Sequence, residues 1–454
     1  MNANSNMTGL DFIVLHTGAR LVGEPVEITG VSTDTRRIRA GELFVALSGP
    51  RFDGHDFAAQ AADAGAAALL VDHEIDCDLP QLIVDDTLIA LGRFAAAWRS
   101  NFSLSVIGVT GSTGKTTVKQ MLTAILSERG DVLATEGNLN NEIGVPLTLL
   151  RLRDEHRFAV IEMGANHAGE IAFLAGLVRP GIGLVTNAGA AHLEGFGSIE
   201  GVVEAKGEMY AGVVDGGTCI INGDQPWTED WKARAGARRK LTFGMSEASD
   251  FHVDGDVQET DDGIRFRMAS RDGAIDVELP LHGQHNVMNA LAAATAACAA
   301  DIDLPTIADG FRKVANVGGR MHVERLDNGV VLVDDTYNAN PLSMRAAIDW
   351  LAAGQRRGWL VMGDMGELGP DARSLHEEVG SYAAECGVER LYCLGELSAA
   401  ACAAFGSAHC YTNHNQLIDA LAGELEAGVT VLVKGSRSAR MERVTADLRE
   451  RGMR

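Results

Sequence analysis

The sequence predicts an α/β protein built from three domains. A chain of 454 residues is too long for a single hydrophobic core. Short apolar runs of strand length alternate with segments whose apolar residues recur at helical spacing, which predicts mostly parallel sheets. Hydrophobic residues make up 46% of the chain and charged residues 22%, as is typical of globular proteins.

Residues 1–85 are expected to form a small mixed α/β domain. An Ala-rich helix is predicted over 57–67, and a helix over 86–98 follows at the start of the next domain. The predicted strands of this domain cover residues 42–47, 68–71 and 82–84.

Residues 86–317 are expected to form a central domain with a mostly parallel sheet. Its later strands are predicted over 158–163, 183–187 and 218–222, and a helix over 287–300. Residues 250–282 alternate apolar and polar side chains instead, which predicts a small β-meander added to that sheet.

Residues 318–454 are expected to form a Rossmann-like α/β domain. Its predicted strands cover 330–333, 359–362, 391–394 and 430–433, and each ends in polar or Gly-rich residues. The carboxyl ends of the strands are where open sheets of this kind bind ligands.

The most informative local pattern is a phosphate-binding loop at residues 108–117, Gly-Val-Thr-Gly-Ser-Thr-Gly-Lys-Thr-Thr. It lies between a predicted strand and a predicted helix, so its backbone N–H groups can surround phosphate oxygens at a helix N-terminus. Lys115 would reach the β- and γ-phosphates, and the hydroxyl of Thr116 would bind Mg²⁺. Val109 stands where the usual pattern has glycine, so this is a subclass of the loop.

Charge and cysteine content exclude several classes of function. The net charge of −23 argues against nucleic acid as a partner, and it requires local positive charge around any phosphorylated substrate. No apolar run is long enough for a membrane span. The seven cysteines form no Cys-x-x-Cys pair, so we expect reduced, buried cysteines in the cytoplasm instead of disulfides or a zinc site.

Four further segments carry polar side chains that could bind a ligand, although each alone has an ordinary structural explanation. Glu162 could be a metal ligand or a solvated acid, and His192 a ligand or a structural histidine. Residues 135–146 are rich in amides and could form a simple turn, and residues 334–341 could cap a helix.

Taken together, the segments resemble the Mur ligase family of ATP-dependent amide-forming enzymes along nearly the whole chain. The resemblance rests on residues 110–117, 138–141, 162–164, 187–192, 205–208, 283–291, 319–320 and 334–341. Within the family the chain looks most like the member that adds D-alanyl-D-alanine to UDP-N-acetylmuramoyl-tripeptide. That narrower resemblance rests on residues 32–36, 52–55, 335–341, 363–369 and 434–442, with Thr336 where Ser is commoner.

The resemblance implies a role for each matching residue in binding ATP and metal. Lys115, Lys206, His192 and Arg320 would be catalytic. ATP would be bound by Gly111, Ser112, Thr113, Gly114, Lys115, Thr116, Thr117, Asn286, Asn289, Arg320 and Asp335, with Asn286 and Asn289 at the adenine. Two Mg²⁺ sites are implied, one at Thr116 and Glu162 and one at His192 and a carbamylated Lys206.

The resemblance also implies where the other substrates bind. Ser32, Thr33, Asp34 and Arg36 would contact the uridine diphosphate. The other implied substrate-binding residues are Asn138, Asn140, Asn141, Tyr337, Asn338, Asn340, Asp364, Lys434 and Ser436, with Glu367 beside the last three in the dipeptide pocket. The protein is expected to be a cytoplasmic monomer whose third domain closes about a hinge near residues 315–319.

The expected reaction is phosphorylation of a carboxylate by ATP, followed by attack of an amine on the acyl phosphate. A folylpolyglutamate-synthase-like ligase is the nearest alternative, but the N-terminal segment of the UDP-binding type argues against it. A GTPase-like switch would need the Asn-Lys-x-Asp motif, which the sequence lacks. A small-molecule kinase would give a phosphorylated product and need no amine.

Overall fold

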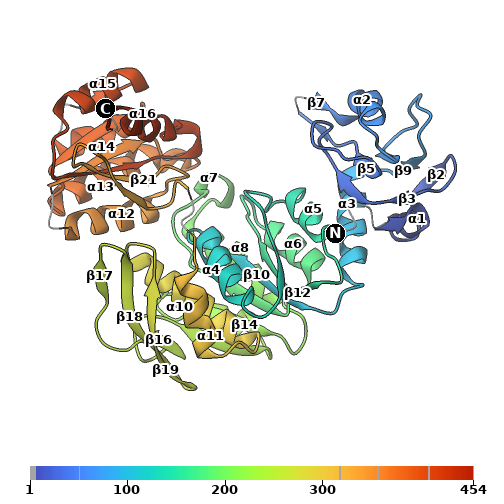
Figure 1. The fold of residues 1–454 in the computed structure, drawn as a ribbon, viewed down its shortest axis with the longest axis horizontal. Helices are drawn as coiled ribbons and strands as arrows, with labels where there is room; N and C mark the ends of the chain where they lie inside the picture. The colour runs from blue at the N-terminus through green and yellow to red at the C-terminus, as the bar shows by residue number, and fades with distance from the viewer. Residues whose placement is uncertain (1–6, 51, 316–317, 355–356, 407–408, 453–454) are drawn as a thin grey trace. The chain divides into compact units, whose positions relative to one another are not determined.

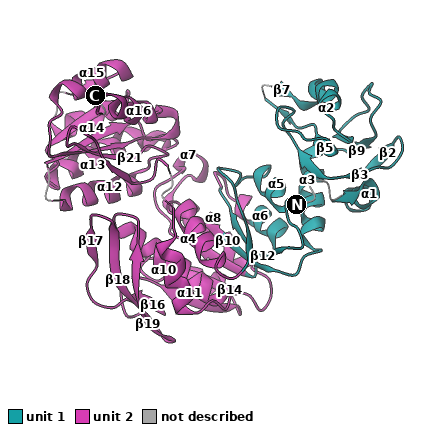
Figure 2. Ribbon diagram, viewed as in Figure 1, with its two compact units in different colours: residues 1–108, 130–164, 172–181 teal, residues 109–129, 165–171, 182–454 magenta. Residues whose placement is uncertain are grey.

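The computed structural model describes residues 7–50, 52–315, 318–354, 357–406 and 409–452 (Figure 1). The chain divides into two compact units (Figure 2), one of residues 1–108, 130–164 and 172–181, the other of residues 109–129, 165–171 and 182–454. These units do not follow the boundaries expected after residues 85 and 317, which stay predictions. Within the described ranges, no helix is long and apolar enough to cross a membrane.

The N-terminal part of the first unit contains a five-stranded sheet in the order β2-β9-β8-β5-β4. Three predicted strands are confirmed as β5 (Glu42–Val45), β8 (Ala68–Val71) and β9 (Gln81–Ile83), which pair in parallel. The helix predicted over 57–67 is shorter, comprising η1 (Gly54–Phe57) and α2 (Ala58–Asp63). It ends early because Gly65 adopts a left-handed φ of 94°, which is not helical.

Several short elements complete the first unit. The helix expected from residue 86 is confirmed as α3 (Thr87–Arg99), whose first turn is capped by the Asp86 carboxylate. Strands β11 (Asp131–Ala134) and β12 (His156–Glu162) pair in parallel. The remaining elements are β1 (Thr8–Gly9), α1 (Leu10–Thr17), β2 (Arg20–Val22), β3 (Glu27–Ile28), β4 (Gly30–Ser32), β6 (Ser48–Gly49), β7 (Phe52–Asp53) and α5 (Gly144–Leu149). Strand β10 (Ser105–Thr110) and helix α6 (Glu170–Val178) have residues in both units.

The second unit begins its sheet with the parallel strands β13 (Ile182–Val185), β14 (Thr218–Asn222) and β15 (Arg239–Phe243). The predicted β-meander is confirmed as the antiparallel strands β16 (Phe251–Val253), β17 (Gln258–Thr260), β18 (Gly263–Ser270) and β19 (Gly273–Leu279). The helices are α4 (Lys115–Leu126), α7 (Leu193–Phe196), α8 (Ile199–Gly212), α9 (Thr228–Arg234), α10 (Gln284–Ala299) and α11 (Leu304–Arg312).

The C-terminal part of the second unit has the doubly wound sheet that the sequence predicts, in the order β20-β21-β25-β22-β23-β24. Along β22, Trp359 and Val361 enter one apolar core while Leu360 and Met362 enter the other, so helices cover both faces. The strands are β20 (His322–Arg325), β21 (Val331–Asp335), β22 (Arg357–Gly363), β23 (Arg390–Leu394), β24 (Cys410–Tyr411) and β25 (Val429–Lys434). The helices are α12 (Pro341–Ala353), η2 (Gly369–Asp371), α13 (Ala372–Glu385), α14 (Ser398–Phe405), α15 (His414–Glu424), η3 (Arg437–Ala439) and α16 (Glu442–Gly452).

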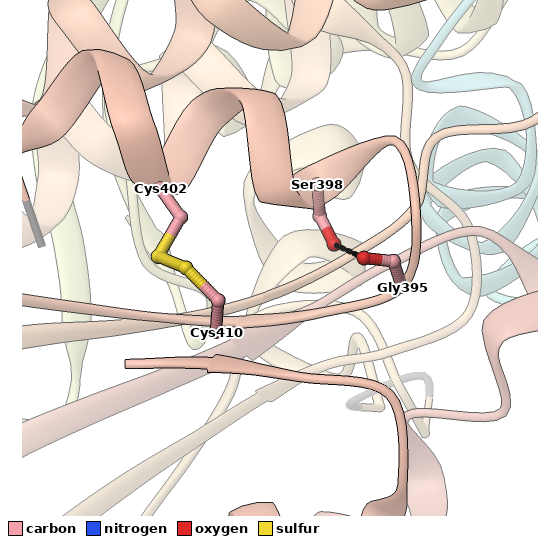
Figure 3. The surroundings of a disulfide bond; sticks show 4 residues. All are labelled: Gly395, Ser398, Cys402 and Cys410. Carbon is pink, nitrogen blue, oxygen red and sulfur yellow. Dashed lines mark hydrogen bonds between the residues drawn. A yellow bond between two sulfur atoms is a disulfide. The ribbon is translucent and has the colours of Figure 1, made fainter. Parts of the chain in front are cut away.

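The expectation that all cysteines are reduced is wrong for Cys402 and Cys410, which form a disulfide (Figure 3). Helix α14 and strand β24 bring the two residues together with a Cα–Cα distance of 6.3 Å, within the usual range for a disulfide. The pairing depends on the packing of a helix end against an edge strand, which the cysteine spacing does not reveal. The other five cysteines are free.

Helices α13 and α14 pack closely at Gly380, and this contact generates a stability prediction. A Cβ at Gly380 would clash with the backbone of Ala401. Gly380→Ala should therefore lower the stability of this part by about 1–3 kcal/mol, although alanine favours helix by about 1 kcal/mol. Gly423→Ala in α15 is the matched control, because no atom lies within 4 Å of its Cβ position. A melting temperature of Gly380→Ala, measured by calorimetry, that equals or exceeds that of Gly423→Ala would contradict the prediction.

Candidate active site

The phosphate-binding loop lies between the end of β10 and the start of α4, as the sequence predicts. Gly111 and Gly114 have φ values of 143° and 79°, which L side chains rarely adopt. A Cβ on Gly111 would clash with Thr186 Oγ1, and one on Gly114 with Asn289 Oδ1. Both glycines are therefore required by backbone conformation and by close packing.

The end of β13 holds the loop in this conformation. Asn187 accepts hydrogen bonds from the backbone N–H of Ser112, through its carbonyl at 3.0 Å, and from that of Thr113, through Oδ1 at 3.0 Å. Thr186 Oγ1 donates to the Thr113 carbonyl at 2.6 Å. From the sequence, neither Thr186 nor Asn187 was expected to support the loop. Both lie at the end of the strand predicted over 183–187, which was the available signal.

Two cationic side chains converge on the loop. Lys115 Nζ donates to the Gly111 carbonyl at 2.7 Å. Arg320 Nη2 donates to Thr116 Oγ1 at 3.1 Å across 204 residues of sequence, and its guanidinium lies 4.1 Å from the centre of the Tyr337 ring. Arg320 Nε is buried and has no hydrogen-bond partner among the described residues, so it is available to an anionic ligand.

Lys206 is almost fully buried on α8, at 1% exposure. Its Nζ donates to the Ala165 carbonyl at 3.2 Å and lies 5.0 Å from the centre of the Phe196 ring. Burial, followed by the charge of Lys115, lowers the pKa of Lys206 to about 7. A substantial fraction of this amine is therefore unprotonated at neutral pH. The unprotonated amine is the form that reacts with CO₂.

His192 is held in an uncommon conformation between two segments that are distant in sequence. It has a φ of 54°, and its Nδ1 forms an ion pair with the carboxylate of Glu367, which itself has a φ of 61°. Burial lowers the pKa of His192, and the Glu367 carboxylate opposes that effect. Both residues thus adopt a backbone conformation that is uncommon for residues other than glycine.

The amides of residues 135–146 hold the other predicted metal ligand in the first unit. Asn140 Nδ2 donates to Glu162 Oε1 at 2.8 Å, and Glu162 is 2% exposed. Asn140 also accepts from the Gly164 N–H, and Asn141 Oδ1 accepts from the Gly144 N–H. Asn138 accepts from the Asn140 N–H through its carbonyl at 2.8 Å.

The N-terminus of α10 lies against the phosphate loop through its two predicted adenine contacts. Asn289 Nδ2 donates to Asn286 Oδ1 at 2.9 Å, and Asn289 Oδ1 closely approaches Gly114. His285, which directly precedes Asn286, has a buried Nδ1 without a hydrogen-bond partner in the described part of the chain. His285 belongs to a motif noted in the sequence but was given no role.

Asp335 and Lys434 meet where β21 and β25 end side by side. Lys434 Nζ contacts Asp335 Oδ2 at 2.5 Å and donates to the Asn338 carbonyl at 3.0 Å, and both charged residues are buried. Because β25 lies between β21 and β22, this pair occupies a position where ligands bind in open sheets.

The remaining predicted residues of the third domain have clear local contacts. Asn340 caps α12 and forms a capping box with Ser343. Asp364 Oδ1 accepts from the Ser398 N–H at 2.7 Å, and the Asp364 carbonyl accepts from the Ser436 N–H at 2.9 Å. The loops after β22 and β25 are thus tied together beside the Asp335–Lys434 pair.

The predicted uridine-diphosphate loop is ordered by its own side chains. Asp34 Oδ1 accepts from Arg36 Nε and Asp34 Oδ2 from Arg36 Nη2, each at 2.8 Å, and Ser32 Oγ accepts from the Asp34 N–H at 3.2 Å. Hydrogen bonds from Arg36 lower the pKa of Asp34 to about 2. Thr33 lies between Ser32 and Asp34 and is partly exposed.

Comparison with known proteins identifies relatives along nearly the whole chain. Residues 27–99 match the Mur ligase family catalytic domain, 109–297 the Mur ligase middle domain and 319–437 the Mur ligase glutamate ligase domain. UDP-N-acetylmuramoyl-tripeptide–D-alanyl-D-alanine ligase of Escherichia coli (strain K12) is 45% identical, over 95% of this chain and 96% of that protein.

Solved structures agree with these sequence matches. A crystal structure of MurF from Acinetobacter baumannii has a TM-score of 0.91 and 35% identity, and the match covers 97% of this chain and 98% of that one. MurF ligase from Thermotoga maritima in complex with ADP has a TM-score of 0.83 and 29% identity, over 93% and 97% of the two chains.

The geometry of Gly114 generates a prediction for nucleotide binding. Gly114→Ala should weaken ADP binding at least about tenfold, because the new Cβ forces Asn289 and the loop apart and the left-handed φ is strained. Gly216→Ala is the matched control, with a φ of 77° and no atom within 4 Å of its Cβ position. Each variant should also lose about 1–2 kcal/mol of stability from backbone strain. Equal ADP dissociation constants for the two variants by titration calorimetry would refute the assignment of the loop.

Proposed function

This chain belongs to the Mur ligase family, and we propose that its phosphate loop, buried lysine and third-domain arginine carry out amide formation through an acyl phosphate. The enzyme is an ATP-dependent ligase that adds D-alanyl-D-alanine to UDP-N-acetylmuramoyl-tripeptide, a step of peptidoglycan synthesis. The single observation that carries the mechanistic proposal is the contact of Arg320 with Thr116 inside the phosphate loop.

The proposed reaction has two steps. The carboxylate of the UDP-linked tripeptide attacks the γ-phosphorus of ATP, which forms an acyl phosphate and releases ADP. The amino group of the dipeptide then attacks the acyl carbon, an amide forms and orthophosphate leaves. Because phosphoryl transfer needs mainly positioning and charge neutralisation, cationic side chains around the loop are the expected machinery.

Each cation then has a defined task. Lys115 and the loop N–H groups would hold the phosphates, and Lys115 would reduce repulsion between the γ-phosphate and the attacking carboxylate. Arg320 would move its guanidinium from Thr116 to the γ-phosphate when nucleotide binds. Its unpartnered Nε and its position on the Tyr337 ring support this task.

Two Mg²⁺ ions are part of the proposal. Thr116 and Glu162 would hold one, and His192 with a carbamylated Lys206 the other. The Thr116 hydroxyl and the buried Glu162 carboxylate are oxygen donors of the kind that Mg²⁺ prefers, a carbamate on Lys206 would add further oxygens, and His192 would add an imidazole nitrogen. When bound, the ions would neutralise negative charge on the phosphates and the carboxylate.

We assign the other substrates by domain. Asn286 and Asn289 would contact adenine and Asp335 the ribose, for which Asp335 would have to exchange its bond to Lys434. The loop of Ser32, Thr33, Asp34 and Arg36 would bind uridine diphosphate. Asp364, Lys434 and Ser436 would bind the dipeptide. Closure of the third domain stays a prediction, and residues 316–317 of the expected hinge lie outside the described residues.

Product analysis tests the reaction directly. With ATP, the UDP-linked tripeptide and D-alanyl-D-alanine, mass spectrometry should detect the UDP-linked pentapeptide, and sustained orthophosphate release should require the dipeptide. Lys115→Ala should lower the rate by about 10²–10³-fold because a phosphate-binding cation is lost. Lys232→Ala, which removes an exposed lysine paired with Glu229, should leave the rate unchanged. Equal orthophosphate release with and without the dipeptide would exclude the coupling of the two steps.

The carbamylated state of Lys206 has its own test. Lys206→Ala should lose at least about 10²-fold in rate, and a short-chain carboxylate such as acetate should restore part of it by replacing the carbamate. Because the pKa of Lys206 is lowered to about 7, the neutral amine predominates above that pH and is lost below it. Wild-type activity after bicarbonate treatment should therefore rise as the pH passes upward through 7, whereas the acetate-rescued variant should lack this step. Full activity of Lys206→Ala without acetate would contradict the role.

A further inference from the structure

The β-meander has no part in the chemistry above, yet one of its side chains joins three segments of the second unit. Glu259 on β17 places Oε1 at 3.0 Å from His282 Nδ1, 3.1 Å from the Gly283 backbone N and 2.8 Å from Trp350 Nε1. His282 and Gly283 immediately precede α10, and Trp350 belongs to α12 of the third domain. Strand β17 and helix α12, both in the second unit, lie side by side in Figure 1.

The carboxylate of Glu259 remains ionised despite its surroundings. Burial would raise the pKa of Glu259, but the hydrogen bonds from His282, Trp350 and Gly283 outweigh it, so the pKa is lowered. A charged acceptor strengthens each of these hydrogen bonds. The contact of Trp350 with Glu259 is therefore a specific polar interaction between α12 and the meander.

Hydrogen bonds continue from Glu259 to the phosphate loop. The Gly283 carbonyl accepts from the Asn286 N–H at 2.8 Å, and the His282 carbonyl accepts from Asn286 Nδ2 at 2.7 Å. Asn286 in turn accepts from Asn289, whose Oδ1 lies against Gly114. The orientation of both asparagines thus depends on the backbone that Glu259 holds.

Helix α12 links Glu259 to the segment that follows β21. It is capped by Asn340, in the segment that follows Asp335 at the end of β21 and contains Tyr337. When Trp350 contacts Glu259, the third domain is held to the meander by the helix that begins beside the Arg320–Tyr337 stack. Docking of the third domain and the conformation at the start of α10 therefore both depend on the Glu259 carboxylate.

We propose that Glu259 is a positioning residue that couples docking of the third domain, through Trp350, to the geometry of Asn286 and Asn289. The inference rests on the proposed role of these asparagines at the adenine. Its consequence is that nucleotide affinity depends on the Trp350–Glu259 hydrogen bond, whereas dipeptide affinity does not. The β-meander then has a function, which is to present this acceptor.

Trp350→Phe tests the coupling because it removes the indole N–H and keeps an aromatic ring. The dissociation constant for ADP and the KM for ATP should rise about fivefold or more, with the KM for D-alanyl-D-alanine and kcat within about twofold of wild type. Trp98→Phe is the matched control. It removes an indole bond to the Leu152 carbonyl at 3.2 Å in the other unit and should leave ADP binding unchanged.

A double-mutant cycle separates this coupling from a general loss of structure. Glu259→Gln keeps one acceptor oxygen but loses the charge, so it should weaken ADP binding less than Glu259→Ala, which should weaken binding as Trp350→Phe does. The double variant Glu259→Ala with Trp350→Phe should be no weaker than Glu259→Ala alone. The proposal is overturned if Trp350→Phe has the same ADP dissociation constant as the Trp98→Phe control. It is also overturned if the double variant weakens ADP binding by the product of the fold-changes of Glu259→Ala and Trp350→Phe. ADP titration does not depend on product formation, so failure here is distinguishable from failure of the proposed reaction.

Discussion

The site depends on one constraint, which is that the backbone N–H groups between β10 and α4 must stay open toward a phosphate. Glycine at positions 111 and 114 permits the conformation, but glycine alone leaves a loop free to collapse. The residues after β13 restrict the loop, because Asn187 and Thr186 form hydrogen bonds with Thr113. They also occupy the space that a side chain at position 111 would need. The rigid loop then fixes where Lys115, Arg320 and the start of α10 can act.

Positive charge at the site is concentrated against a strongly acidic background. The chain carries a net charge of −23, and two of its substrates, ATP and the UDP-linked tripeptide, are anionic. Burial is what makes the few cations effective, because the desolvated Lys206 and the buried Lys434 interact with their neighbours far more strongly than surface lysines do. The same burial lowers the pKa of Lys206 to about 7, so a substantial fraction of this amine is neutral at pH 7.

Polar contacts join the third domain to the rest of the second unit. Arg320 meets Thr116, Glu367 meets His192, and Trp350 meets Glu259. Polar contacts of this kind can form and break without exposing a large apolar surface, which suits a site that must admit three substrates and then exclude water. The two left-handed residues at 192 and 367 indicate that one of these contacts is maintained at a cost in backbone strain.

Local pattern in the sequence determined the phosphate loop, the main strands, the β-meander and the doubly wound third domain, because periodicity and glycine placement act over a few residues. The disulfide of Cys402 and Cys410, the burial of Lys206, the support of the loop by Asn187 and the pairing of His192 with Glu367 were decided only by the tertiary structure. Each of these features depends on which strand ends and helices come together, and burial and pairing between segments far apart in sequence leave no local pattern to detect.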